Sequence, residues 1–237
     1  MRRQTLPVAV ILGCALLTNV LRAQDEKGFI SMFNGKDLSG WEGEAGWWSV
    51  EDGAITGITT AEKPLKRATY LFWRGTTPDH RGGNATDFEL RATYRIVGGN
   101  SGINFRSRQL PHWDVHGYQA DIEAGPTYTG ILYEVNQRAV MALRGQKVEF
   151  DQNGAKTTTA FADAKELQKA VKADGWNECH VIARGPEILI KVNGVLMSHV
   201  IDREQGKAAR EGLFCLQLHP GPPMKVQFKD LRVKHLR

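Results

Sequence analysis

Hydrophobic and polar positions alternate over long stretches of this chain. In residues 87–97 every second side chain is apolar: Phe88, Leu90, Ala92, Tyr94 and Ile96. A strict period of two is typical of a β-strand that buries one face and exposes the other. After the turn sequence Gly98-Gly99-Asn100, the alternation resumes in residues 102–106. The pattern therefore predicts two strands joined by a tight glycine turn.

Further strands are predicted nearer the C-terminus. Residues 187–192 and 195–200 flank Asn193-Gly194, and Asn-Gly is the strongest short hairpin signal because a type I′ turn needs positive φ at both central residues. The apolar-rich segments 213–218 and 226–233 predict two closing strands. Residues 59–85, rich in Gly, Pro, Thr and charge, predict a long loop around a short strand.

Only one segment has helical spacing. Asp163 can act as an N-cap for Ala164–Ala173, and Gly175 is expected to end this helix. Many short strands, frequent glycine turns and one short helix are typical of an all-β sandwich or barrel, not of alternating βα units. The chain has no linker-like segment and no internal repeat, so we expect one domain over residues 28–237.

The N-terminal segment has the order of a secretory signal peptide. Arg2 and Arg3 precede an apolar run that is short for a membrane span, and polar residues begin after Ala23. We predict a signal peptide at residues 1–23, a secreted or periplasmic location, and no membrane association after cleavage. Residues 11–14 resemble a lipobox, so a lipid anchor at Cys14 is the minor alternative.

Charge adds little once the signal peptide is set aside. The chain has 31 Lys and Arg against 26 Asp and Glu, a formal net charge of +5. Three of those arginines and no acidic residue lie in residues 1–23, so the remainder carries a net charge of +2. Phosphate binding needs a clustered basic face. We see no such cluster in the sequence, and we do not expect a nucleic-acid partner.

Two cysteines, Cys179 and Cys215, lie outside the predicted signal peptide. Two cysteines are no disulfide framework, and no paired-Cys metal spacing occurs. Both lie in strand-like runs, which favours buried thiols. A single bridge between neighbouring strands is the alternative in an oxidising compartment.

A series of short motifs runs through the chain in a specific order. They are Phe33-Asn34-Gly35-Lys36-Asp37-Leu38-Ser39-Gly40-Trp41, Asn100-Ser101-Gly102-Ile103, Gly117-Tyr118-Gln119-Ala120-Asp121, Gly175-Trp176-Asn177 and Leu216-Gln217-Leu218-His219. In this order and spacing the chain resembles the 3-keto-disaccharide hydrolase domain from residue 29 to residue 236. The resemblance implies a concanavalin A-like jelly-roll sandwich of two antiparallel sheets, with a sugar site on the concave face. It also implies cleavage of glycosides that are already oxidised at C3.

Such a substrate needs few protein groups. A ketone at C3 acidifies the hydrogen at C2, so a base can remove that proton and the C1 substituent then leaves by β-elimination. Water can add back, which makes the net reaction a hydrolysis. The site needs a base, a donor to the enolate oxygen and an acid for the leaving oxygen. The competing chemistry uses two carboxylates and an oxocarbenium-like transition state.

Strand alternation indicates which polar groups could meet. In residues 118–122, Gln119 and Asp121 share the face opposite Tyr118. Within the matched motifs we predict Asp121, Glu134 and His219 as the acid and base groups. A histidine ordinarily titrates near pH ~6.5, so it could serve either role. Asp121 and His219 could instead be ordinary solvent-facing residues of a strand and a strand end.

Other polar and aromatic residues are candidates for holding the sugar: Asn100, Arg106, Gln119, Tyr133, Trp176 and Gln217. Arginine offers a fixed fork of donors suited to a developing enolate oxygen, and tryptophan can stack on a sugar ring. A structural ion pair with Asp121 is the alternative for Arg106, and burial in the core is the alternative for Trp176.

The sequence thus predicts an exported hydrolase, or lyase and hydratase, that cleaves 3-keto-glycosides or related oxidised disaccharides. Its partner would be a small carbohydrate substrate. The alternative is a non-catalytic carbohydrate-binding module on the same lectin-like scaffold, because a fold does not establish activity. No cofactor is expected. A hard divalent cation on carboxylate oxygens stays open, although the spacing shows no cluster of ligands.

Overall fold

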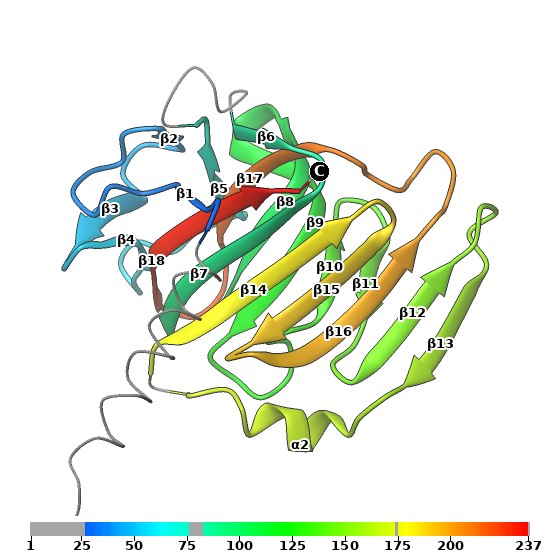
Figure 1. Ribbon diagram of the computed structural model, residues 1–237. Coiled ribbons are helices and arrows are strands. Elements are labelled where there is room, and N and C mark those ends of the chain that lie inside the picture. The colour runs from blue at the N-terminus through cyan, green and yellow to red at the C-terminus, as the bar shows by residue number, and fades with distance from the viewer. Residues whose placement is uncertain (1–26, 76–82, 174, 237) are drawn as a thin grey trace, which may run out of the picture.

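Most of the chain forms strands that pair into two sheets (Figure 1). The computed structural model describes residues 27–75, 83–173 and 175–236. In spatial order, sheet A contains β13 (Lys156–Ala160), β12 (Gln146–Phe150), β16 (Val195–Asp202), β15 (Glu187–Val192), β14 (Asn177–Arg184), β7 (Phe88–Val97), β18 (Met224–His235), β4 (Ala54–Thr59) and β3 (Trp48–Glu51), and β1 (Ile30–Ser31) pairs with β18. Sheet B contains β11 (Ala139–Ala142), β10 (Leu132–Val135), β9 (Asp114–Glu123), β8 (Asn100–Leu110), β17 (Gly212–Leu218), β5 (Thr69–Trp73) and β2 (Trp41–Glu42), and β6 (Asn84–Ala85) pairs with β17.

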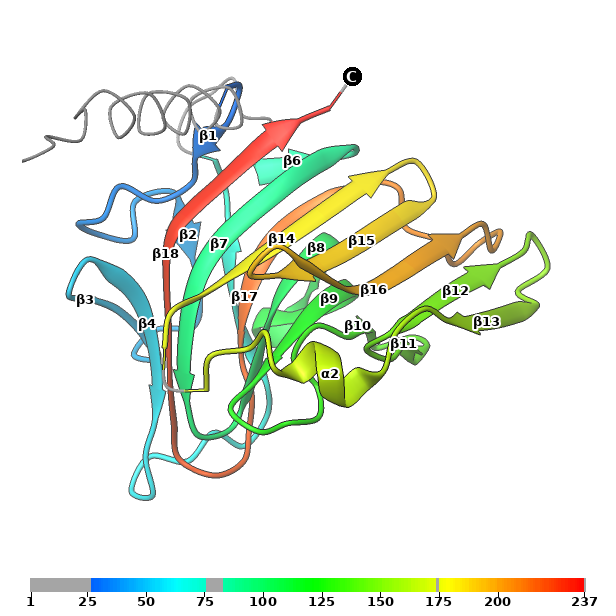
Figure 2. The ribbon, with the colours of Figure 1, turned by 60° about the horizontal axis from the view of Figure 1, so that its bottom comes forward.

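The two sheets pack face to face, and the main core lies between them (Figure 2). The inward side chains of both sheets interdigitate, as in other aligned sandwiches. The ring of Phe88 on sheet A lies edge-on to Phe214 on sheet B, with centroids 4.7 Å apart, and 5.8 Å from the ring of Phe105. The predicted all-β, concanavalin A-like jelly-roll sandwich is confirmed.

The alternating segment behaves as expected. β7 buries every second side chain from Phe88 to Ile96 against the core. Gly98 and Gly99 both have positive φ, and a Cβ on Gly98 would lie 2.5 Å from the carbonyl oxygen of Pro223. This turn carries the chain from sheet A to sheet B, so β7 and β8 do not pair with each other. A glycine turn is needed there because the chain must reverse against the adjacent loop.

The predicted hairpin is also present. β15 and β16 pair in antiparallel register, with Val192 opposite Val195. Asn193 and Gly194 have φ values of 50° and 81°, as a type I′ turn requires.

One strand pair departs from the antiparallel pattern of the sheets. β12 runs parallel to β16, with Val148 opposite Val200, so sheet A is not purely antiparallel. A parallel pair requires a long crossover connection. The chain supplies one, because β13, α2 (Ala164–Gln168), β14 and β15 all lie between β12 and β16 in sequence.

The helix is shorter than predicted. Asp163 caps it by accepting hydrogen bonds from the backbone N–H groups of Lys165 and Glu166, at 2.8 and 3.0 Å. The regular helix ends at Gln168 instead of continuing to Ala173. Beyond it, two asparagine side chains take over the backbone groups: Asn193 donates to the carbonyl of Ala170, and Asn177 bonds both backbone groups of Lys172. Backbone turns with i→i+3 hydrogen bonds continue as far as Val171, and the asparagine contacts hold this irregular segment.

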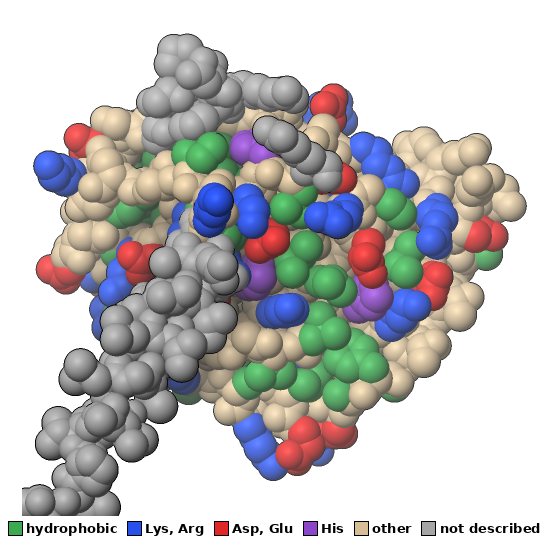
Figure 3. Space-filling model, viewed as in Figure 1, with side chains coloured by type: hydrophobic (Ala, Val, Ile, Leu, Met, Phe, Trp, Pro, Cys, Tyr) green, Lys and Arg blue, Asp and Glu red, His purple; other side chains and the backbone are tan. Residues whose placement is uncertain are grey.

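The outer face of sheet A is chemically mixed. Figure 3 shows lysine, arginine, acidic and histidine side chains spread among hydrophobic ones over the strands of this sheet. Arg232 bonds Glu178 at 3.2 Å, and His180 lies 3.5 Å from Glu89. Alternating charges of both signs are typical of a solvated face.

Three further expectations concern the cysteines and the N-terminus. Cys179 and Cys215 are both buried and both free, because they belong to different sheets. Among the described residues, no helix is long and apolar enough to cross a membrane. The predicted signal peptide and Cys14 lie outside the described residues.

Candidate functional site

A cleft of about 920 Å³ opens on the face of sheet B that points away from sheet A. Strands β5, β8, β9, β10 and β17 contribute its floor, and the turn that contains the short 3₁₀ helix η2 (Pro111–Trp113) contributes part of its wall. The polar and aromatic lining residues are Arg67, Tyr70, Asn100, His112, Asp114, Gln119, Asp121, Glu123, Tyr128, Tyr133, Asn136, Gln217 and His219. A concave site with a few converging polar groups is the usual form of a small-molecule site.

Strand alternation explains why these side chains converge. In β9, Tyr118, Ala120 and Ile122 belong to the core between the sheets, so Gln119 and Asp121 point to the opposite face. In β17 the same rule turns Gln217 outward while Leu216 and Leu218 join the core. The period-two pattern thus brings polar residues from distant strands onto one floor.

The floor is joined by a chain of amide hydrogen bonds. The Gln119 Nε2 group donates to Asp121 Oδ1 at 2.5 Å and to Gln217 Oε1 at 3.3 Å. Gln217 Nε2 in turn donates to the hydroxyl oxygen of Tyr70 at 3.0 Å. Gln119 reaches Gln217 by passing over Gly102 of β8, where any Cβ would lie 2.5 Å from the Gln119 side chain. Glycine at this position is therefore a packing requirement.

Asp121 is the unusual group of the cleft. Its residue is only 7% exposed. Burial is the main reason that its pKa is raised to about 7, with a smaller upward contribution from the negative charge of Glu123, while the hydrogen bond from Gln119 works in the opposite direction. A carboxyl group that is half-protonated near neutral pH is suited to proton transfer.

Two buried amides on the cleft face of the floor have unused hydrogen-bonding atoms. Within the described part of the chain, neither amide atom of Asn104 has a partner, nor does Gln119 Oε1. Asn104 lies directly between Gln119 and Cys215 in the strand register. Buried polar atoms are normally paired, so such atoms point to a water molecule or a ligand.

His219 lies at the rim, where β17 ends. It is exposed, and its Nδ1 atom lies 2.6 Å from the carbonyl oxygen of Pro220. A carbonyl oxygen can only accept a hydrogen bond, so Nδ1 carries the proton and Nε2 of the neutral ring keeps its lone pair. Asn100 lines the cleft at the start of β8. The rim therefore offers one proton acceptor beside an amide.

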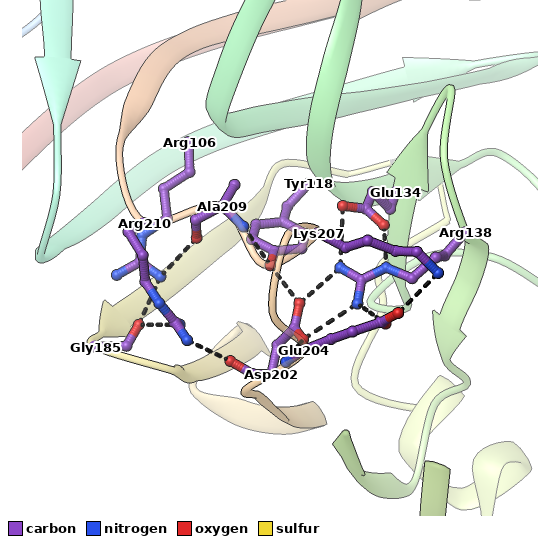
Figure 4. Close-up of polar contacts among 10 residues, drawn as sticks. All are labelled: Arg106, Tyr118, Glu134, Arg138, Gly185, Asp202, Glu204, Lys207, Ala209 and Arg210. Atoms are coloured by element: carbon purple, nitrogen blue, oxygen red, sulfur yellow. Dashed lines mark hydrogen bonds and ion pairs between the residues drawn. The ribbon is translucent and has the colours of Figure 1, made fainter. Parts of the chain in front are cut away.

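Glu134 does not lie in the cleft, contrary to expectation. Its side chain shares the inner face of β10 with Leu132, is fully buried, and forms an ion pair with Arg138 (Figure 4). Arg138 also bonds Asp202 at 2.7 Å and Glu204 at 2.9 Å. Glu134 is thus part of an ionic cluster between the sheets, while its neighbour Tyr133 faces the cleft.

Arg106 is also directed away from the cleft. It has a φ of 46° and lies in an irregularity of the β8–β9 register, which breaks the alternation on which its predicted position depended. Its guanidinium donates to the carbonyl oxygens of Thr86 and Gly185 and pairs with Asp87 at 3.0 Å. The expected partner Asp121 is not involved.

Trp176 lies just before β14 and packs against side chains of sheet A. It is half-buried, with the Lys229 ammonium 4.3 Å and the Arg95 guanidinium 5.0 Å from the centroids of its rings. The cationic partners belong to β18 and β7 of sheet A, so Trp176 cannot contact a ligand in the cleft of sheet B.

The remaining predicted residues line one cleft: Asn100, Gln119, Asp121, Tyr133, Gln217 and His219. Tyr70 and Glu123 also line the cleft, although neither was predicted from the sequence as a site residue. Glu123 shares the period-two face of Asp121, which could have indicated its place. Tyr70 belongs to a strand that is buried throughout, where no alternation distinguishes the two faces.

A metal centre has no support in the described residues. No group of three or more His, Cys, Asp or Glu side chains there could hold a metal ion.

The fold is a two-sheet sandwich with an amide-rich cleft on the outer face of one sheet. A family model described as a 3-keto-alpha-glucoside-1,2-lyase-like domain matches residues 28–234, and the chain belongs to this family. No curated protein matches the chain.

Solved structures share the fold at low sequence identity. A candidate glycosyl hydrolase from Parabacteroides distasonis is 19% identical, with a TM-score of 0.57 over 91% of this chain and 97% of that one. The carbohydrate-binding module CBM66 from Bacillus subtilis is 14% identical, with a TM-score of 0.53 over 84% of this chain and 98% of that one. A galectin-like protein from Bacillus subtilis is 11% identical, with a TM-score of 0.53 over 84% and 90% of the two chains.

Proposed function

We propose that this protein cleaves 3-keto-glycosides by removing the proton at C2 and eliminating the substituent at C1. The observation that carries the proposal is Asp121, a carboxyl group on the floor of the cleft whose pKa is raised to about 7. A carboxyl group with a raised pKa can hold a proton at neutral pH and donate it to a leaving oxygen. The family to which the chain belongs supports the substrate class.

In the proposed mechanism His219 acts as the base. Its Nε2 lone pair takes the proton from C2, and the electrons of the C2–H bond form an enolate whose charge rests on the C3 oxygen. The amide of Asn100, which lines the cleft at the rim, would stabilise that oxygen. Fixed donors directed at developing charge are the largest catalytic contribution in many enzymes.

Asp121 acts as the acid. As the enolate collapses, the C1–O bond breaks and the departing oxygen takes the Asp121 proton. The products are an unsaturated 3-keto sugar and a free alcohol. Addition of water at C1 of the unsaturated sugar would convert the lyase reaction into a net hydrolysis. Gln119 positions the Asp121 carboxyl through its hydrogen bond to Oδ1, which leaves Oδ2 for the substrate.

We also propose that the protein is exported, because residues 1–23 have the pattern of a signal peptide. Expression of the full chain in a bacterium, followed by mass determination of the secreted or periplasmic product, tests this. A mature N-terminus near residue 24 is expected. An uncleaved chain that stays in the cytoplasm would contradict it.

Incubation of the purified protein with a 3-keto-disaccharide tests the enzymatic proposal. We expect release of the free sugar, and exchange of the C2 hydrogen when the reaction is run in deuterated water. Binding without release over a long incubation would instead favour a carbohydrate-binding module. Cleavage of the unoxidised disaccharide at the same rate would point to an ordinary glycosidase mechanism.

A further inference from the structure

The cleft is polar at one end and apolar at the other. Besides the core between the sheets, sheet B has a second buried hydrophobic cluster on its outer face. It comprises Tyr70, Phe72, Val115, Val135 and Cys215. Tyr133 packs against this cluster from the cleft side. Hydrophobic side chains on the outer face of a sheet normally need a cover, and here part of the cluster forms the cleft floor.

Strand register locates this apolar end. Gln119 of β9 lies opposite Tyr133 of β10, and Tyr133 lies opposite Val140 of β11. This row of paired residues therefore runs from Gln119, which hydrogen-bonds Asp121, to the side chains of Tyr133 and Val140 in the same cleft. Val140 is 37% exposed there, so its surface is open to a ligand.

Asn136 and Asp114, two polar residues near the apolar end, bond to each other and to the backbone. Asn136 Nδ2 donates to Asp114 Oδ2 at 3.0 Å and to the carbonyl oxygen of Val115 at 2.8 Å, and Asp114 Oδ1 accepts from the Val115 N–H. The unused amide atoms of Asn104 and Gln119 belong instead to the floor beside Asp121. The Tyr133 ring, Val135 and Val140 offer carbon surface at this end, against which a hydroxyl-rich group would give up water without gaining a hydrogen bond.

We infer that the Tyr133–Val135–Val140 end of the cleft is a subsite for an apolar leaving group. The preferred substrates would then be 3-keto-glycosides of an aliphatic or aromatic alcohol, in preference to 3-keto-disaccharides. This inference rests on the proposed function, because it assigns the sugar ring to the Asp121 end. It also fits the assignment of Asp121 as the acid, since Asp121 and Gln119 lie next to the row that would hold the leaving oxygen.

The test compares leaving groups that differ in apolar surface, and the methyl and butyl compounds among them leave as alkoxides of similar basicity. The protein is incubated with the 3-keto derivatives of methyl glucoside, butyl glucoside and maltose, and kcat/KM is measured for each. We expect the butyl compound to exceed both the methyl compound and the disaccharide by about tenfold or more, as one to a few buried methylene groups allow. Equal or better cleavage of the disaccharide would overturn the inference while leaving the proposed function intact.

A matched pair of variants assigns the effect to the subsite. Val140→Ser should reduce the butyl-to-methyl ratio of kcat/KM by about fivefold or more. Val195→Ser is the control, because Val195 is also 37% exposed but begins β16 on sheet A. An unchanged ratio in Val140→Ser, or an equal change in both variants, would overturn the inference.

Calorimetry with the unoxidised glycosides covers the case in which no 3-keto compound is cleaved. Butyl glucoside should bind more tightly than maltose, and Val140→Ser should remove that preference. Loss of cleavage with this binding preference retained would defeat the proposed function and keep the subsite. Tighter binding of maltose would defeat the subsite.

Discussion

Two regions of this protein bury carboxyl groups, and they do so in opposite ways. Around Arg138, the carboxylates of Glu134, Asp202 and Glu204 surround one guanidinium. On the cleft floor, Asp121 is buried beside Gln119, and among the described residues no Lys or Arg hydrogen-bonds to it. The first arrangement pairs its carboxylates with a shared cation and links β10 of sheet B to β16 of sheet A. The second leaves a carboxyl group uncompensated and open to a ligand.

The pKa values reflect this difference. Burial would raise the pKa of Asp202, but the hydrogen bonds from Arg138 and Tyr118 outweigh it and the net shift is downward. The pKa of Glu204 is lowered by its hydrogen bond to Lys207, against the effect of burial, with a further contribution from Arg138. The pKa of Asp121 is raised to about 7 because no hydrogen bond from a cation opposes the effect of burial. Asp202 and Glu204 are therefore favoured in their ionised form, whereas Asp121 can keep a proton that is available for transfer.

The largest effect is expected at the proton-transfer groups. Asp121→Asn and His219→Ala should each lower turnover of a 3-keto-glycoside by roughly two to four orders of magnitude, because each removes a proton donor or acceptor. Steady-state kinetics measure this, and circular dichroism with thermal unfolding checks that both variants fold. Near-native turnover in both would show that the active groups lie elsewhere.

The next largest effect concerns stability alone. Arg138→Ala should lower the free energy of unfolding by about 3–5 kcal/mol, because it leaves buried carboxylates without their cation. The measurement is a urea titration at pH 7. Arg203→Ala is the control: its pair with Glu149 is 3.7 Å long and its side chain is 49% exposed, so the change should stay within about 0.5 kcal/mol. A small loss in Arg138→Ala would mean that the cluster relaxes or hydrates.

The two regions should also respond oppositely to pH. Asp121 has a raised pKa in the folded state, so its contribution to stability is present below pH ~4 and is lost as the pH rises through about 7. Asp202 and Glu204 have lowered pKa values, so their contribution is present above the ordinary carboxyl range and is lost as the pH falls below it.

Urea titrations from pH 4 to pH 8 measure this contrast. The stability of Asp121→Asn relative to the wild type should rise across that range, by on the order of 2–4 kcal/mol. The penalty of Arg138→Ala should shrink towards the acid end. A difference between Asp121→Asn and the wild type that does not depend on pH would contradict the raised pKa.

The smallest effect tests the packing under the amide chain. Gly102→Ala places a Cβ 2.5 Å from the Gln119 side chain, which should cost about 1–3 kcal/mol of stability through overpacking. It should also lower turnover about tenfold by displacing Gln119 from Asp121. Adding Gln119→Ser should recover the stability but not the turnover, because the space is relieved while the hydrogen bond stays lost. Additive effects in this double-mutant cycle would mean that the two residues do not meet.

The sequence by itself determined the strands and the faces that their side chains occupy. Alternation in residues 87–97 and the Asn193-Gly194 turn are local signals, and local sterics are sufficient to produce the strand and the hairpin. The same period of two put Gln119 and Asp121 on one face. The family motifs directed attention to Gln217, Asn100 and His219, which the structure brings to the same cleft.

Only the tertiary structure decided which polar residues meet. Glu134 and Asp121 are both buried carboxyl groups on strands, and their roles differ because Arg138 pairs with Glu134, whereas among the described residues no Lys or Arg hydrogen-bonds to Asp121. Arg106 points away from the cleft because it has a left-handed backbone conformation within β8, and alternation does not predict such a residue. The shift in the pKa of Asp121 depends on burial beneath side chains from several strands, and burial is a property of the assembled sandwich, not of any segment of its sequence.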